Sequence, residues 1–287
     1  MIVRKNRKGT INDGRFSVPF RVYGEASTRI VCVSGAQQTM AAWRPCIRYF
    51  SRDKSIVVFD LPGLGDAKIL DDETQVHIDE QIALLDEVIK ETTNREHLVL
   101  CGASWGSMVA CAYAARYPDR VDKLILGSFG LTLNDELREV IVQGQRLHDE
   151  ERLDEVAHLI LERFGQKVSG VYRAGIIRQF KDLSRQQAMT LYHHCTFVNS
   201  CESVDEFIEL KNISAKTLII NGEQDTIIDA SDAKHAAELI PDAEFMLIPE
   251  AGHFLHIENS SILKIYEDFI EQPPSPGLTP RKANSYQ

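Results

Sequence analysis

The sequence lacks the cysteine and histidine spacings that commonly hold metal ions. Six of its 287 residues are cysteine, but no two form a Cys-x-x-Cys pair and no histidines follow them at zinc-finger spacing. The Asp and His residues likewise form no cluster with the spacing of metal ligands. We therefore expect neither a metal ion nor an organic cofactor. Cys32 and Cys101 fall inside apolar, strand-like runs, where a buried free thiol is the expected state.

Long apolar runs and a surplus of positive charge are also missing. No run approaches the length needed to cross a bilayer, and the opening MIVRKNRKGTINDGRF contains no apolar stretch that would serve as a signal sequence. The formal net charge is −10, which argues against a nucleic-acid partner. These absences predict a protein without a transmembrane segment, located in the reducing cytoplasm.

What the chain does contain is the pattern of a parallel sheet covered by helices. Its hydrophobic content of 44% is enough to fill a sizeable core, and its length suits one α/β domain with an insertion. Short apolar runs alternate with helix-length segments. Residues 76–91 form one such segment, with isoleucines and a leucine spaced along a single face. The predicted strands are 30–33, 55–59, 97–101, 123–126, 216–220 and 243–248.

The alternation of strands and helices stops after Leu126. From 131 to 210 the pattern is helical and polar, and strands resume at Lys216. Parallel sheets bind ligands at the carboxyl ends of their strands, so a helical insertion at this point predicts a lid over a substrate pocket. The expected organisation is a core formed by 1–130 and 213–270, a helical lid at 131–212, and a disordered tail at 271–287.

Gly102-Ala103-Ser104-Trp105-Gly106 is the strongest chemical signal. It follows a predicted strand and precedes a predicted helix, the context in which Gly-x-Ser-x-Gly lifts a serine above the edge of a sheet. A serine at a helix N-terminus also lies beside free N–H groups that favour a developing oxyanion. The alternative interpretation is an ordinary Gly/Ser-rich turn. The strand–turn–helix context favours Ser104 as a nucleophile.

A nucleophilic serine needs a base that is held by an acid, and this architecture orders them Ser, Asp or Glu, then His. Asp225 comes just beyond the predicted strand 216–220, and His253 follows the last strand. We predict that His253 acts as base and acid and that Asp225 orients it and stabilises its charge. Glu223 and Asp229 flank Asp225 and are the alternative acids. His256 lacks a preceding glycine and is expected to have a packing or surface role.

The oxyanion hole is expected to combine two backbone N–H groups. One belongs to Trp105, and the other to Ala36 in the loop after the first core strand. Ser34 stands where such enzymes commonly have a histidine. Because the donor is backbone, this change is compatible with the hole. Gln37 is a candidate for an additional side-chain contact.

The predicted lid carries a run of basic residues within an acidic protein. Between 163 and 185 the only acidic residue is Asp182. A solvated helical face is one interpretation, and a docking patch for an acidic partner is the other. Such a partner would be a carrier protein, the phosphates of coenzyme A or an acidic substrate. The adjacent His193 and His194 suggest a solvated pair or a substrate contact. The basic residues are Arg163, Lys167, Arg173, Arg178, Lys181 and Arg185, of which Arg173, Arg178 and Lys181 are the docking candidates.

These motifs together support a family resemblance. The core resembles the α/β-hydrolase superfamily over most of residues 20–270. Within it, the chain is similar to the 3-hydroxyacyl-carrier-protein acyltransferases that make the lipid precursor of rhamnolipids. The residues that carry the resemblance are Phe59-Asp60-Leu61-Pro62, Ala103-Ser104-Trp105-Gly106, Leu133-Asn134, Asn221-Gly222 ahead of Asp225, and Gly252-His253-Phe254-Leu255 followed by Glu258.

The resemblance implies transfer or hydrolysis of 3-hydroxyacyl chains delivered as thioesters in lipid or biosurfactant synthesis. Ser104 would take the acyl group, and a hydroxy acid or water would accept it. A generic esterase, thioesterase or lactonase is the alternative, because any nucleophile that reaches an acyl-enzyme first can resolve it. A non-catalytic receptor on the same fold would be expected to have a broken triad, and all three positions are intact here.

Overall fold

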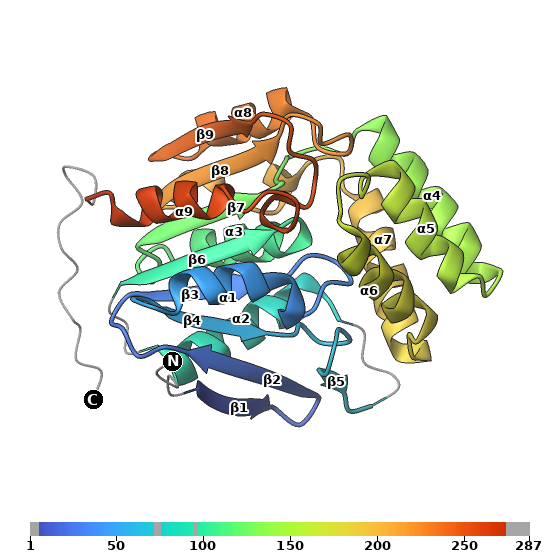
Figure 1. Ribbon diagram of the computed structural model, residues 1–287, viewed down its shortest axis with the longest axis horizontal. Coiled ribbons are helices and arrows are strands. Elements are labelled where there is room, and N and C mark those ends of the chain that lie inside the picture. Colours follow the sequence, from blue (N-terminus) through green and yellow to red (C-terminus); the bar gives the residue numbers. More distant parts are fainter. Residues whose placement is uncertain (1–5, 72–75, 94–96, 274–287) are drawn as a thin grey trace.

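The structure is a computed structural model that describes residues 6–71, 76–93 and 97–273. In this part of the chain nine strands form one sheet, in the order β1-β2-β4-β3-β6-β7-β8-β9, with β5 paired to β2 (Figure 1). The pairs from β4 to β9 are parallel, and β1, β2 and β5 pair antiparallel. The strands are Asn6–Asn12 (β1), Phe16–Tyr23 (β2), Arg29–Val33 (β3), Ser55–Phe59 (β4), Lys68–Ile69 (β5), Leu98–Ala103 (β6), Lys123–Gly127 (β7), Lys216–Gly222 (β8) and Ala243–Ile248 (β9).

Helices cover both faces of this sheet, as expected for parallel strands that are apolar throughout. One apolar cluster joins α2, α3 and α8 to the sheet, and a second joins α1 and α9 to its other face. These helices are Arg44–Phe50 (α1), Ile78–Thr92 (α2), Trp105–Arg116 (α3), Ala230–Leu239 (α8) and Ile262–Glu271 (α9). The predicted α/β class, with a mostly parallel sheet between helices, is confirmed.

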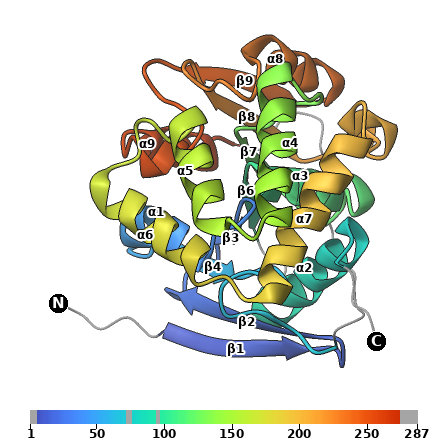
Figure 2. The same ribbon diagram turned by 90° about the vertical axis from the view of Figure 1, so that its right-hand side faces the viewer.

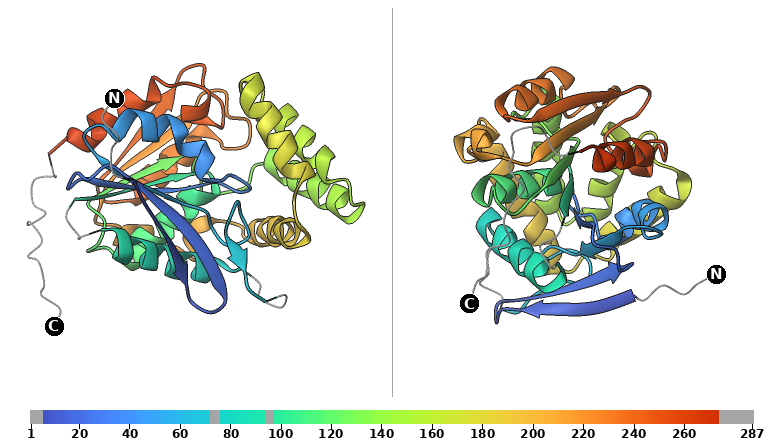
Figure 3. Two further views of the ribbon diagram at one scale, coloured as in Figure 1. Left: turned by 60° about the horizontal axis from the view of Figure 1, so that its bottom comes forward. Right: turned by 90° about the vertical axis from the view of Figure 1, so that its left-hand side faces the viewer.

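All six predicted strands are present, but the sequence did not reveal β1, β2 and β5. The β1–β2 hairpin lies at one edge of the sheet and β9 at the other (Figure 3). β4 is fully buried, whereas residues along β2 alternate between buried and half-buried. The sequence criteria therefore found the strands that pair in parallel and missed the antiparallel edge.

Four further helices stand over the carboxyl ends of the strands (Figure 2). They follow β7 and precede β8, within the segment predicted as a lid, and we call them the α4–α7 insertion. They have a small apolar cluster of their own, which includes Leu147, Ala157 and Phe180. The insertion therefore packs as a unit above the sheet edge. Its helices are Asp135–Asp149 (α4), Leu153–Arg163 (α5), Gly170–Lys181 (α6) and Arg185–Ser200 (α7).

The predicted disordered tail began at Glu271, but Glu271 is the last residue of α9. The buried Lys123 caps this helix by donating hydrogen bonds to the carbonyls of Phe269, Ile270 and Gln272. A cation at a helix C-terminus satisfies carbonyls that have no partner within the helix. The rest of the predicted tail, 274–287, lies outside the described residues.

Candidate active site

Ser104 lies in the sharp turn between β6 and α3. Its φ of 52° and ψ of −120° are in a region that non-glycine residues rarely occupy. The two flanking glycines make the turn possible, because a Cβ on Gly102 would clash with the backbone of Ser107, and one on Gly106 would clash with that of Val33. The serine hydroxyl is thereby raised above the sheet edge at the N-terminus of α3.

Three side chains from separate loops form one hydrogen-bonded chain. The Ser104 Oγ lies 3.0 Å from Nε2 of His253, and Nδ1 of His253 lies 2.8 Å from Oδ2 of Asp225. The other carboxylate oxygen of Asp225 accepts hydrogen bonds from the backbone of Ile227 (3.1 Å) and Ile228 (3.2 Å). Because the carboxylate accepts the Nδ1–H, Nε2 is free to accept the serine proton.

The loop that carries His253 is fixed on both sides. Glu258 accepts hydrogen bonds from the backbone N–H of Gly252 (2.7 Å) and Phe254 (3.2 Å). The Ser128 hydroxyl donates to the carbonyl of His253 (2.6 Å). The imidazole is therefore held by backbone contacts on either side of it, as a proton-transfer group requires.

The alternative acids do not reach the imidazole. Glu223 is exposed and accepts a hydrogen bond from the backbone of Glu250, and Asp229 accepts one from the side chain of Asn134. His256 is buried and stacks on Trp43, with ring centroids 4.7 Å apart. Burial lowers the pKa of His256 to about 4. Of the two roles expected for His256, packing or surface, its burial supports packing.

A comparison of the chain with protein families identifies its fold family. The model of the alpha/beta hydrolase fold matches residues 28–260. The chain belongs to the α/β-hydrolase fold family. The resemblance to these enzymes predicted from the sequence is therefore confirmed, and so is the expectation of an enzyme of this kind.

Among curated relatives, the chain is 26% identical to an (R)-3-hydroxydecanoyl-ACP:CoA transacylase of Pseudomonas putida, over 84% of this chain and 83% of the relative. It is 23% identical to a 2-hydroxy-6-oxo-2,4-heptadienoate hydrolase of another Pseudomonas putida strain, over 85% of this chain and 90% of the relative. The enol-lactonase of Burkholderia xenovorans has the same fold, with a TM-score of 0.78 and 19% identity, and the match covers 93% of this chain and 100% of that one. Transferases and hydrolases thus share this architecture.

In this α/β-hydrolase, Ala36 and Trp105 line the same cavity as Ser104. Trp105 is the first residue of α3, where a backbone N–H has no partner within the helix. Gln37, the candidate for an extra contact, donates instead from its side chain to the carbonyl of Gln187 in α7 (3.4 Å). Ser34 is buried and accepts a hydrogen bond from the indole of Trp43.

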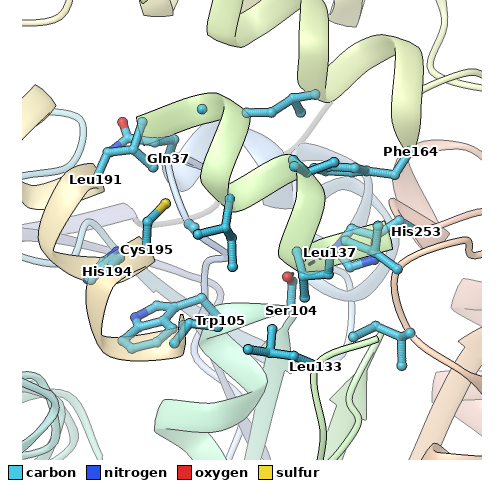
Figure 4. Close-up of a pocket in the computed structure, with 18 of the residues that line it drawn as sticks. Gln37, Ser104, Trp105, Leu133, Leu137, Phe164, Leu191, His194, Cys195 and His253 are labelled. Carbon is cyan, nitrogen blue, oxygen red and sulfur yellow. Dashed lines mark hydrogen bonds between the residues drawn. The ribbon is translucent and has the colours of Figure 1, made fainter. Parts of the chain in front are cut away.

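The cavity above Ser104 has a volume of about 250 Å³ and mostly apolar walls. The α4–α7 insertion supplies much of this lining, including Leu137, Phe164 and Leu191. Figure 4 shows Leu137 next to Ser104, and Leu191 beside Gln37 across the cavity. An apolar cavity that opens onto a serine hydroxyl is suited to an acyl chain whose reacting carbonyl lies at Ser104.

A buried polar network beside this cavity was not recognised in the sequence. The Trp105 indole donates to Oε1 of Gln81 (2.8 Å), whose amide nitrogen donates to Nε2 of His194 (3.1 Å). His194 also stacks on Trp105, with centroids 4.4 Å apart, and burial lowers its pKa to about 4. The solvated alternative for His194 is therefore wrong, because its imidazole lies buried against the wall of the cavity (Figure 4). No local signal predicts the network, since its members come from α2, α3 and α7.

The basic run in the insertion is only partly available to a partner. Arg163 pairs with Glu136 and Glu139, and Arg173 donates to the carbonyl of Gly165. Arg178 and Lys181 are both exposed on α6. Within the described residues, no three His, Cys, Asp or Glu side chains gather as a possible metal site. In the same part of the chain, no helix is long and apolar enough to span a membrane.

Proposed function

We propose that this enzyme transfers acyl groups through a covalent intermediate on Ser104, with His253 and Asp225 completing a catalytic triad. The hydrogen-bonded chain Ser104–His253–Asp225 carries the proposal. The serine Oγ attacks the substrate carbonyl while its proton passes to Nε2 of His253. The C–O or C–S bond to the leaving group then breaks, and the leaving group takes that proton. Asp225 remains ionised and stabilises the imidazolium.

The negative charge that develops on the carbonyl oxygen needs donors that are in place before the reaction. The N–H groups of Ala36 and Trp105 are the proposed donors. Two observations support them: both residues line the cavity at Ser104, and Trp105 begins α3. The hydrogen bonds that join Trp105, Gln81 and His194 stabilise this side of the site and hold the first turn of α3 in place.

The proposed substrate is a 3-hydroxyacyl thioester. Support comes from the apolar cavity and from the transacylase relatives, whose names specify a 3-hydroxydecanoyl group moved between a carrier protein and coenzyme A. Transfer to a second nucleophile requires that water be kept from the acyl-enzyme. The His253 side chain is only 4% exposed, so bulk water has little direct access to the proposed base. A plain hydrolase of esters, thioesters or lactones is the alternative.

The proposed donor of the acyl group is an acidic carrier protein, which docks on α6. Arg178 and Lys181 are exposed there, one helical turn apart, and Arg173 lies on the same helix. Opposite charges steer such encounters and fix their orientation. The six free cysteines agree with the cytoplasmic location predicted for the enzyme.

The test uses purified enzyme, a 3-hydroxydecanoyl-carrier-protein thioester and coenzyme A. Intact-protein mass spectrometry is expected to show one added acyl group, located on Ser104 by peptide mapping, and no adduct in Ser104→Ala. Product analysis then separates the two candidates. Formation of a hydroxyacyl-coenzyme A or a dimeric hydroxyacyl ester supports transfer, whereas free hydroxy acid alone supports the hydrolase. Turnover that survives Ser104→Ala would refute the proposed nucleophile.

A further inference from the structure

One face of α4 forms a wall of the cavity. The lining residues recur at intervals of three and four along the helix, so they share a single face. Gly144 lies in the middle of this stripe and is its only member without a side chain. The lining residues of α4 are Leu137, Val140, Ile141, Gly144, Gln145 and His148.

Neither backbone conformation nor packing requires a glycine at this position. Gly144 lies inside a regular helix, where glycine costs about 1 kcal/mol relative to alanine. Its φ is not positive, and a Cβ built on it would meet no atom within 4 Å. The absence of a side chain therefore leaves open space beside the cavity. Because Gly144 lines the cavity, a bound ligand can occupy this space.

The distance from Ser104 suggests which part of a ligand reaches this space. Leu137 lies next to Ser104 in Figure 4, and Gly144 follows seven residues later, about 10 Å further along the helix axis. The helices α4 and α7 meet beyond it, where the rings of His148 and Tyr192 lie 5.0 Å apart. A chain attached at Ser104 and running along α4 would therefore pass Gly144 with its distal carbons.

We propose that Gly144 sets the length of the acyl chain that the enzyme accepts. Its missing side chain leaves the passage between α4 and α7 open to the distal carbons of a medium-length chain. The inference rests on the proposed function, which places the carbonyl end of the acyl chain at Ser104. A bulky residue at 144 would block the passage and leave the space near Ser104 unchanged.

Gly175 in α6 provides a matched control. A Cβ there would also meet no atom within 4 Å, but Gly175 is exposed and does not line the cavity. Glycine-to-phenylalanine substitutions at the two positions therefore add the same group to a helix, and only one of them adds it to the cavity. Gly144→Ala and Gly175→Ala are each expected to have a higher melting temperature than the protein with glycine, because alanine has the higher helix propensity.

The test measures binding rather than turnover. The parent protein carries Ser104→Ala, and two further proteins carry Gly144→Phe or Gly175→Phe in addition. Calorimetric titration measures how tightly each of the three binds 3-hydroxyhexanoate and 3-hydroxydecanoate. Gly144→Phe is expected to weaken decanoate binding about tenfold or more, because about two methylene groups lose their burial, and to leave hexanoate binding unchanged. Gly175→Phe is expected to bind both acids as the parent does. Circular dichroism verifies that each variant is folded.

Two outcomes would overturn the inference: equal decanoate binding by the two phenylalanine variants, or no binding of either acid by the parent. Binding does not depend on an acyl-enzyme, so the proposed function can fail separately. If Gly144→Phe selectively loses decanoate but the wild-type enzyme never forms an acyl-Ser104, the proposed function is wrong and the role of Gly144 stands.

Discussion

Phe164 stands edge-on against the imidazole of His253, with the two ring centroids 5.3 Å apart. The same ring stacks on Phe254, the residue after the histidine, at 5.9 Å. Phe164 follows α5, so the α4–α7 insertion covers the proposed base directly. We therefore expect this aromatic side chain of the insertion to influence the balance between the proposed transfer and hydrolysis.

Phe164→Ala is expected to raise the share of acyl groups lost to water. Removing the ring opens His253 to solvent, and water then competes with the acyl acceptor for the acyl-enzyme. The measurement is the ratio of free hydroxy acid to transfer product at a fixed acceptor concentration. Phe207→Ala is the control, because Phe207 is 39% exposed and packs on Phe197 outside the cavity lining. An unchanged ratio in Phe164→Ala would show that this ring does not exclude water.

Asp225→Asn is expected to lower kcat roughly ten-thousand-fold, because an amide at this place cannot hold the imidazole in the right tautomer or stabilise its charge. Glu223→Gln is the matched control, since Glu223 is exposed and its carboxylate accepts a hydrogen bond from the backbone N–H of Glu250 rather than from His253. Steady-state kinetics on a small ester compare the two variants without the carrier protein. If Glu223→Gln lowered kcat more than Asp225→Asn, Glu223 rather than Asp225 would be the acid of the triad.

The sequence predicted those parts of the molecule that local patterns determine. Ser104, Asp225 and His253 each follow an apolar strand, and parallel strands end at one edge of the sheet, so their meeting could be expected. The β1–β2 hairpin was missed although Asp13-Gly14 is a recognisable turn signal. β1 is largely exposed and β2 contains a proline, so neither resembles a buried strand.

The remaining parts of the site depend on contacts between distant segments. Gln81, Trp105 and His194 meet only because α7 folds back over α2 and α3. Likewise, no role could be predicted for Gly144 from a polar helical sequence, because the sequence does not show that this helix lines a cavity. Such features have no local pattern, so only the packed structure reveals them.

Replacing Arg178 and Lys181 by Glu is expected to raise KM for a carrier-borne thioester about fivefold, an effect the size of one or two exposed ion pairs. The effect should weaken as salt is added, and KM for a small ester should not change. The double variant Lys211→Glu and Lys234→Glu is the control, because it changes the net charge equally at exposed residues outside the insertion. A similar rise in KM for both substrates, or for both double variants, would argue against docking on α6.

Acidification is expected to destabilise the enzyme through two buried histidines. Burial lowers the pKa of His194 and of His256 from 6.5 to about 4. Between these values the unfolded chain binds protons that the folded chain does not, so the free energy of unfolding falls as the pH falls from about 6.5 to about 4. Each histidine contributes a loss of about 3 kcal/mol over the whole window. Urea unfolding at pH 7 and at pH 4.5 measures the loss.

His256→Phe separates this effect from the protonation of carboxylates, which all variants share. Phenylalanine keeps an aromatic ring against Trp43 and cannot take up a proton, so the variant is expected to lose less stability between the two pH values than the wild type. His235→Gln is the control, because that side chain is 59% exposed and its removal should leave the wild-type pH dependence in place. If His256→Phe loses as much stability as the wild type, His256 is not the group whose protonation opposes folding, and the acid sensitivity arises from other groups, among them His193, His194 and the carboxylates.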